Sequence, residues 1–163
     1  MSVWTHVIGT FTIYDIPKDR NSIWRKKILK RLYKNMGKPS RCLEINKTIV
    51  PEGSEGSLHW TIQEVNLSGD IPLRCRDTTV AKWLQNNCRY GYVISIFGDL
   101  RDYENLQEIR EWFENIIYEP RYNVQDGFLK ADCENGNEIS IDYNWAEKCE
   151  RNKEFDKVME KWL

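Results

Sequence analysis

Alternating apolar and polar positions predict the strands of this chain. Val3–Tyr14 carries apolar side chains on both of its faces, which predicts a central strand that is at least partly covered on both sides. Leu58–Val65 alternates cleanly and predicts a strand with one buried and one wetter face, and the strongly apolar Tyr92–Phe97 predicts another central strand. In the first strand, one face holds Val3, Val7, Phe11 and Ile13, and the other holds Trp4, His6, Ile8 and Tyr14. In the second, Leu58, Trp60 and Ile62 lie opposite His59, Thr61 and Gln63.

Apolar residues at three- and four-residue spacing predict helices. The first spans Ser22–Met36, and Gly37 is suited to end it. Two more begin at Asn105 and Asn144, each followed three residues later by a glutamate, which is the pattern of a capping box. The expected buried stripes are Trp24, Ile28, Leu29, Leu32, Tyr33 and Met36, then Leu106, Ile109, Phe113, Ile116 and Ile117, and finally Phe155, Val158, Met159 and Trp162.

Two further strands, Phe128–Cys133 and Glu138–Tyr143, flank the dipeptide Asn135-Gly136. Asn-Gly favours a two-residue type I′ turn, because both central residues of that turn need a positive φ. Such a loop pairs Asp132 with Ile139 and Lys130 with Ile141. This register places on the core face Phe128, Ile139, Ile141 and Tyr143.

The order of elements is therefore βαββαββα, and Gly98–Asp102 is expected to turn the chain after the third strand. The first six elements match a ferredoxin-like βαββαβ sandwich, with helices on one face of an antiparallel sheet. The C-terminal hairpin strand extends that sheet, and the last helix packs on an edge or an open face. The irregular Asn66–Tyr90 leaves room for a short helix over Thr79–Asn86. We expect one α+β domain over residues 1–163.

Charge and composition narrow the class of partner. Apolar residues make up 40% of the chain, and no apolar run is long enough to span a membrane. The net charge of −1 argues against a long nucleic acid, because phosphate contacts need a basic excess. One basic stripe on the first helix is expected to be its solvated face, with a phosphate-contacting surface as the alternative. This stripe comprises Lys18, Arg20, Arg25, Lys26, Lys27, Lys30, Arg31 and Lys34.

Cysteine usage and the first residues of the chain favour a cytoplasmic protein. The chain has five cysteines without a Cys-x-x-Cys pair, and its N-terminal segment lacks the features of a signal peptide. We therefore expect free thiols in a reducing compartment. Cys75 and Cys88 lack the spacing of zinc ligands, so no metal and no other cofactor is expected.

Two segments suggest contacts to an anion. The loop Gly53–Ser57 can present consecutive backbone N–H groups and two hydroxyls to an anion, although a glycine-adapted turn is the alternative. Arg101 can clamp a phosphate, or it can be held internally by Asp99 and Asp102. Three aromatic rings, Trp4, Trp60 and Tyr92, either form a stacking platform or belong to the core. The candidate ligand-binding residues are Arg101, Ser54, Ser57, Trp4 and Trp60.

His6 and His59 lie on two expected strands and suggest an enzymatic alternative. Two-histidine phosphoesterases carry paired His-x-Ser/Thr motifs. His59-Trp60-Thr61 fits this pattern, but Ile8 stands where the first motif needs a hydroxyl. One histidine as acid and the other as base remains a possible catalytic pair.

Three segments together resemble small proteins encoded by bacteriophages of Firmicutes hosts: Ser2–Val7, Pro51–Leu58 and Gly98–Tyr103. The resemblance implies an accessory protein in the host cytoplasm that counters host defence. The expected activity is non-catalytic sequestration of a nucleotide immune signal, with homo-oligomerisation possible. The alternatives are direct inhibition of a host defence protein by binding, and a phosphodiesterase that uses His6 and His59.

Overall fold

The computed structural model describes residues 2–16, 21–36, 51–66 and 90–160. Over these residues the predicted order of strands and helices is confirmed. The expected helix Thr79–Asn86 lies outside them. The elements are β1 (Trp4–Ile16), α1 (Ile23–Met36), β2 (Leu58–Asn66), β3 (Tyr90–Arg101), α3 (Leu106–Ile117), β4 (Val124–Cys133), β5 (Glu138–Asp142) and α4 (Trp145–Glu160).

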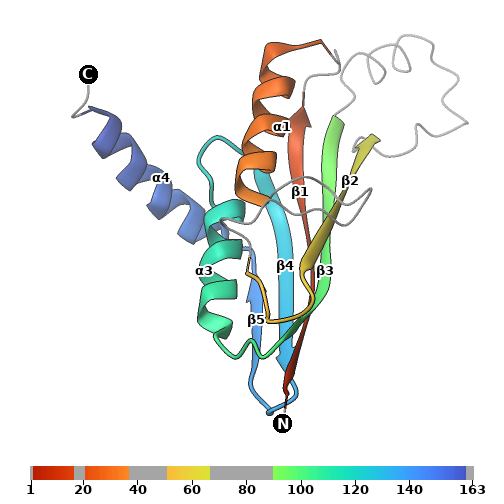
Figure 1. Ribbon diagram of the computed structural model, residues 1–163. Helices are drawn as coiled ribbons and strands as arrows, with labels where there is room; N and C mark the ends of the chain where they lie inside the picture. The colour runs from red at the N-terminus through yellow and green to blue at the C-terminus, as the bar shows by residue number, and fades with distance from the viewer. Residues whose placement is uncertain (1, 17–20, 37–50, 67–89, 161–163) are drawn as a thin grey trace, which may run out of the picture.

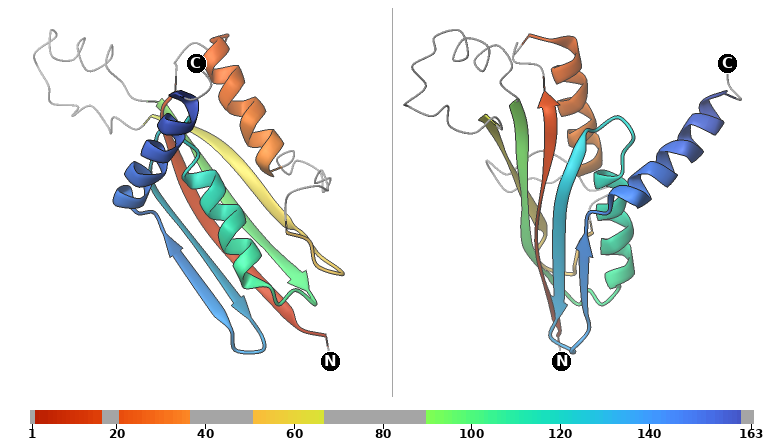
Figure 2. Two further views of the ribbon diagram at one scale, coloured as in Figure 1. Left: turned by 90° about the vertical axis from the view of Figure 1, so that its left-hand side faces the viewer. Right: turned by 180° about the vertical axis from the view of Figure 1, so that it is seen from behind.

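The strands form one antiparallel sheet in the order β2-β3-β1-β4-β5, which confirms the α+β class. β1 is the middle strand, as predicted from its mixed pattern. Figures 1 and 2 show α1 and α3 over the same face of the sheet. No helix in the described part of the chain covers the opposite face, which we call the open face.

The core fills the space between the sheet and its two covering helices. Phe11 of β1 and Phe113 of α3 are fully buried and meet edge to face, with 6.1 Å between ring centroids. The side chain of Asn105 caps α3 by accepting a hydrogen bond from the backbone N–H of Glu108, as predicted. Each large apolar side chain buried here stabilises the fold by about 1.5–3 kcal/mol. The predicted stripe of α3 is confirmed, since all of its members are buried: Leu106, Ile109, Phe113, Ile116 and Ile117.

α1 turns most of its predicted stripe toward the sheet, since Leu32 and Met36 are buried and Ile28 and Leu29 pack partly buried against the core. Trp24 and Tyr33, expected in the apolar stripe, are exposed, whereas Arg25, expected on the wet face, is only 6% exposed. The Arg25 guanidinium forms an ion pair with Glu64 of β2 and lies 5.3 Å from the centre of the Tyr92 ring. A buried charge needs a partner of this kind. The predicted exposure of Arg25 was wrong because the sequence pattern does not reveal that β2 brings a carboxylate under this helix.

β3 runs further than predicted. The segment Gly98–Arg101, expected to turn, stays extended because it pairs with Trp4–Val7 of β1. The chain turns only at Asp102, which adopts a φ of 55° and donates its N–H to the carbonyl of Val3 at 2.7 Å. Aspartate is among the few residues that tolerate this conformation. The longer strand carries Arg101 to the end of the sheet.

The β4–β5 hairpin differs from its predicted register by one residue. Asp132 pairs with Glu138 rather than with Ile139. Of the loop residues, Gly136 alone adopts a positive φ, so the type I′ turn is not formed. Asn-Gly also suits a three-residue loop, in which only the glycine needs that conformation. Because a one-residue shift exchanges the two faces of a strand, Phe128 lies on the open face and not in the core as predicted.

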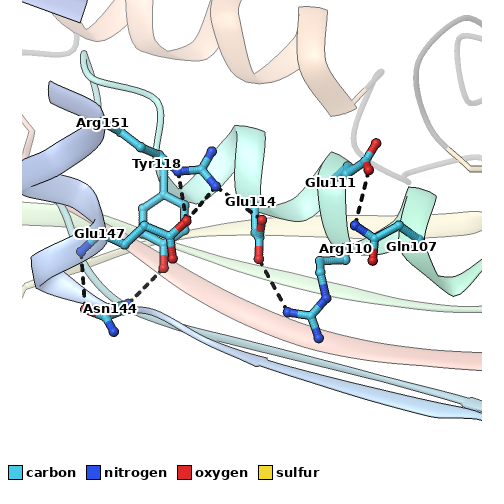
Figure 3. Close-up of polar contacts among 8 residues, drawn as sticks. All are labelled: Gln107, Arg110, Glu111, Glu114, Tyr118, Asn144, Glu147 and Arg151. Atoms are coloured by element: carbon cyan, nitrogen blue, oxygen red, sulfur yellow. Dashed lines mark hydrogen bonds and ion pairs between the residues drawn. The ribbon is translucent and has the colours of Figure 1, made fainter. Parts of the chain in front are cut away.

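The polar contacts that join α4 to α3 come from the first two turns of α4 (Figure 3). Asn144 caps α4 as predicted, and its backbone N–H donates to the Tyr118 hydroxyl at 3.0 Å. Arg151 bridges Glu147 of α4 and Glu114 of α3, and its guanidinium lies 4.6 Å from the centre of the Tyr118 ring. Beyond these turns α4 points away from the sheet (Figure 1).

Lys148 fixes the start of α4 from inside. It is 3% exposed, and its Nζ donates to the backbone carbonyls of Glu119 and Tyr122 at 2.5 and 3.2 Å. Of the apolar stripe predicted for this helix, Phe155 is half-buried. Trp162 lies outside the described residues, and of Val158 and Met159 the structure describes only the backbone, as part of α4.

Burial lowers the pKa of the Lys148 amine to about 8. Between about pH 8 and pH 10, the unfolded chain therefore binds this proton more tightly than the folded chain, and the contribution to stability rises with pH. We expect the difference in unfolding free energy between the native chain and Lys148→Met to grow in favour of the native chain across this window. Urea titrations at several pH values measure it, and a pH-independent difference would contradict the prediction.

Candidate binding face of the sheet

An apolar strip crosses the open face. His59 of β2, Phe97 of β3 and Ile8 of β1 occupy one row of paired residues. The His59 ring stacks on Phe97 with 5.7 Å between centroids, and Ile8 is 60% exposed. Phe128 of β4 stands in the next row, diagonal to Ile8, where side chains are about 7–8 Å apart. We call these four residues the apolar strip.

Carboxylates surround the apolar strip. The acidic side chains on this face are Asp99, Asp126, Asp132, Glu138 and Asp142. The cations near them are already paired, since Lys130 Nζ lies 2.9 Å from Asp132 and 3.5 Å from Glu138. The bond from Lys130 holds the pKa of Asp132 below its ordinary value. His6 Nδ1 lies 2.6 Å from Asp99. The open face therefore carries a surplus of negative charge.

The loop Gly53–Ser57 docks on the end of β3. The Ser54 N–H donates to the Arg101 carbonyl at 2.8 Å, and the Arg101 N–H donates to the Glu55 carbonyl at 2.9 Å. The first bond uses a backbone N–H that the loop would otherwise offer to an anion. The loop thus extends the sheet end instead of standing apart from it.

Two glycines make this docking possible. A Cβ built on Gly56 would lie 2.0 Å from the Asp99 carbonyl oxygen, and Gly56 has a φ of 76°. A Cβ on Gly53 would lie 2.5 Å from the backbone of Arg101. Only glycine permits both the close approach and the positive φ. This geometry favours the glycine-adapted turn over the anion nest.

Arg101 is paired by the loop that was expected to act with it. Its Nη1 lies 2.5 Å from a Glu55 carboxylate oxygen, and its Nε lies 3.9 Å from Asp102. The hydrogen bond to Glu55 raises the pKa of Arg101. The Ser54 hydroxyl donates to Asp102 at 2.7 Å and lowers the pKa of that carboxyl. Carboxylates thus occupy the positions where a bound phosphate was expected.

Four of the five expected ligand-binding residues meet where the loop Gly53–Ser57 docks on the end of β3, a place that we call the corner. Trp4 pairs with Arg101, and its ring is 3.4 Å from the position of a Cβ on Gly56. Ser54 contacts the carbonyl of Arg101, and Ser57 ends the loop in a β-bridge. The corner therefore joins an aromatic ring, hydroxyls and a guanidinium, as expected, but with its charge already balanced.

Trp60 does not belong to this corner. It is 2% exposed and lies on the helix-covered face, with its ring 5.9 Å from that of Tyr33. Tyr92 is buried on the same face. The strict alternation of β2 and β3 turns both rings inward, away from Trp4. The three rings therefore form no common platform, and the interpretation of Trp60 and Tyr92 as core residues is the right one.

The two histidines share the open face but are not adjacent. β3 runs between β1, which carries His6, and β2, which carries His59. Neighbouring strands are about 4.8 Å apart, so two strands separated by a third lie about 10 Å apart. His6 is bonded to Asp99 and His59 stacks on Phe97. This arrangement does not direct the two imidazoles to one phosphate position.

Sequence reasoning missed the apolar strip. The sequence predicts that Ile8 belongs to a partly covered face, that Phe97 ends a strongly apolar central strand, and that Phe128 lies on the core face of the hairpin. The available signal was the position of Ile8 between His6 and Thr10, two polar residues on the same face of β1. The correct hairpin register adds Phe128 to it.

The described residues contain neither a cluster of metal ligands nor a membrane-spanning helix. Within the described ranges, no three side chains of histidine, cysteine, aspartate or glutamate gather as metal ligands. Cys133 is buried and Cys149 half-buried, both as free thiols. Cys42, Cys75 and Cys88 lie outside the described residues. No helix among the described elements is long and apolar enough to cross a bilayer.

Comparison with known proteins gives no relative from which a function could be transferred. No family model matches the chain, and neither a curated protein nor a solved structure is significantly similar to it.

Proposed function

We propose that the protein is a non-catalytic binding protein whose open sheet face docks on another protein. The apolar strip carries this proposal, because Ile8, Phe97 and Phe128 expose 60, 45 and 37% of their area on a paired, rigid sheet. Adjacent exposed apolar side chains are typical of interaction sites. The strip supplies the apolar centre of an interface, and the surrounding carboxylates supply its polar rim.

The charge of the open face defines the chemistry of the partner. Its surplus of carboxylates disfavours phosphate-rich ligands and also disfavours a second copy docked face to face, since like charges would meet. A protein surface with apolar side chains flanked by lysine or arginine is complementary. We therefore assign the open face to a partner of that kind.

Two further observations bear on the fold and on the source of the partner. The strand order β2-β3-β1-β4 with antiparallel neighbours, and helices on one face, supports a ferredoxin-like sandwich extended by β5. The resemblance to small phage proteins supports a bacterial host protein as the partner. Inhibition of a host defence protein in the host cytoplasm is then the biological outcome.

The test compares two variants of matched exposure. Ile8→Ser combined with Phe97→Ser removes the centre of the apolar strip, and Trp24→Ser removes an equally exposed ring from α1 on the other side. The native chain captures a partner from bacterial lysate, which is then purified for titration. We expect the double variant to bind this partner at least about tenfold more weakly, and the Trp24→Ser control to bind as the native chain does. Equal binding by all three proteins would overturn the proposal.

Sequestration of a nucleotide is the second candidate. The convergence of Trp4, Arg101 and the loop Gly53–Ser57 at one corner favours it, although Glu55 competes for Arg101. Protein purified from bacterial cells and then heated should release an intact nucleotide if this candidate holds. Loss of that nucleotide in Arg101→Gln, with capture of the protein partner unchanged, would place the function at the corner instead of the apolar strip.

A further inference from the structure

The charge of this protein is distributed unevenly over its surface. The open face is acidic, whereas α1, on the covered side, contains no acidic residue (Figure 2). The exposed lysines of α1 are Lys26, Lys27, Lys30 and Lys34. Within residues 2–16, 21–36, 51–66 and 90–160, none of these four lysines forms an ion pair. The net charge of −1 therefore conceals a cationic surface.

We propose that the outer face of α1 is a second binding surface, which takes the phosphate backbone of a single-stranded nucleic acid. Lys27, Lys30 and Lys34 follow one another at three- and four-residue spacing, so their side chains share one side of the helix. With a rise of 1.5 Å per residue, Lys27 and Lys34 are about 10 Å apart along the axis. This row offers several positive charges to consecutive phosphates.

Trp24 adds a stacking surface at the start of this row. Its ring is 63% exposed, and Lys27 Nζ lies 4.8 Å from the ring centre. An exposed aromatic ring beside lysines is the combination that holds an unpaired base while its phosphates are neutralised. A duplex hides its bases from such a ring, so the combination favours a single strand.

An anionic membrane fits this surface less well. The apolar residues of α1, including Leu32 and Met36, are buried against the sheet. In the first turn of α1, the side chains of Ile23 and Trp24 are strongly exposed. These two neighbouring residues do not form a long apolar stripe. A helix that lies in a bilayer needs a continuous apolar face to insert. The lysines of α1 therefore suit a soluble polyanion.

A net charge of −1 describes the molecule as one sphere and does not show where its lysines gather. Arg25, counted in the basic stripe, is buried against Glu64 and is not available. The remaining lysines lie on the opposite side of the sheet from the carboxylates of the open face, and α3, on their own side, contributes glutamates. A polyanion can therefore reach the α1 surface while staying clear of the open face.

The test uses the full chain and a labelled single-stranded oligonucleotide at low salt. The variant Lys27→Gln/Lys30→Gln/Lys34→Gln removes the row, and Lys130→Gln/Lys153→Gln/Lys157→Gln removes the same charge elsewhere. We expect the native chain to bind in the micromolar range and the α1 variant to bind at least about tenfold more weakly, with a salt slope smaller by about two. The control variant keeps most of the affinity, and Trp24→Ala weakens binding without changing the salt slope.

Three outcomes would overturn this inference. The first is that the native chain fails to bind the oligonucleotide at low salt. The second is that both triple variants lose affinity equally, and the third is that anionic vesicles bind while the oligonucleotide does not. Sedimentation of the native chain alone serves as a further check. Self-association that depends on the same lysines, without oligonucleotide binding, would assign the α1 surface to the acidic open face of a second copy.

Discussion

Arg25→Met is expected to lower the free energy of unfolding by about 2–3 kcal/mol. The substitution keeps the apolar stem of the side chain but removes the guanidinium and with it the ion pair to Glu64. Removal of one member of a buried ion pair costs about 3–5 kcal/mol. The lower value applies here because the Glu64 side chain is 31% exposed and regains part of its hydration. Urea denaturation followed by circular dichroism measures the loss.

Two companions make this result specific. Lys26→Met changes the neighbouring exposed cation on the same helix and is expected to leave the stability within about 0.5 kcal/mol of the native chain. Arg25→Met combined with Glu64→Met replaces the pair by two apolar side chains and should recover part of the loss, because no unpaired charge remains. Equal stability of Arg25→Met and Lys26→Met would show that the ion pair does not stabilise the fold.

Gly56→Ala is expected to destabilise the protein by about 3 kcal/mol. A positive φ costs an alanine about 1–2 kcal/mol, and its Cβ would lie 2.0 Å from the Asp99 carbonyl oxygen. To relieve this clash, the loop must move off β3. This movement weakens the two hydrogen bonds between loop and strand, from the Ser54 N–H to the Arg101 carbonyl and from the Arg101 N–H to the Glu55 carbonyl. Each such bond contributes about 1 kcal/mol. Thermal and urea unfolding report the effect.

Gly136→Ala is the matched control for this prediction. Gly136 also has a positive φ, 92°, but a Cβ built there meets nothing within 4 Å. Its substitution should therefore cost only the conformational part, about 1 kcal/mol. If the two alanine variants lose the same stability, the close contact between the loop and β3 contributes nothing.

The strands could be predicted because period-two alternation reports directly on burial. Leu58, Trp60 and the buried face of β1 are where the pattern places them. α1 shows the limit of this reasoning, since hydrophobicity directs an arginine outward and a tryptophan inward. Arg25 is inside because Glu64 stands beneath it, and that contact joins residues 39 positions apart. No local pattern contains this information.

The hairpin shows a second limit, which affects the candidate site more. Asn135-Gly136 is compatible with two loop lengths that differ by one residue, and the sequence does not distinguish them. The difference decides whether Phe128 lies in the core or on the open face. The corner of Trp4 and Arg101 was foreseen as a meeting point. Its neutralisation by Glu55 was not, although that carboxylate belongs to the same short loop.

The separation of charge between α1 and the open face has a consequence for how partners are selected. At physiological ionic strength the Debye length is about 8 Å, which is less than the thickness of a sheet with a helix layer. At larger separations, a partner experiences an almost neutral particle, which exerts neither electrostatic attraction nor an orienting force on it. Orientation begins only at near contact, where the open face repels a polyanion that the lysines of α1 accept. Recognition by this protein should therefore depend on dissociation rates far more than on electrostatic acceleration of encounter.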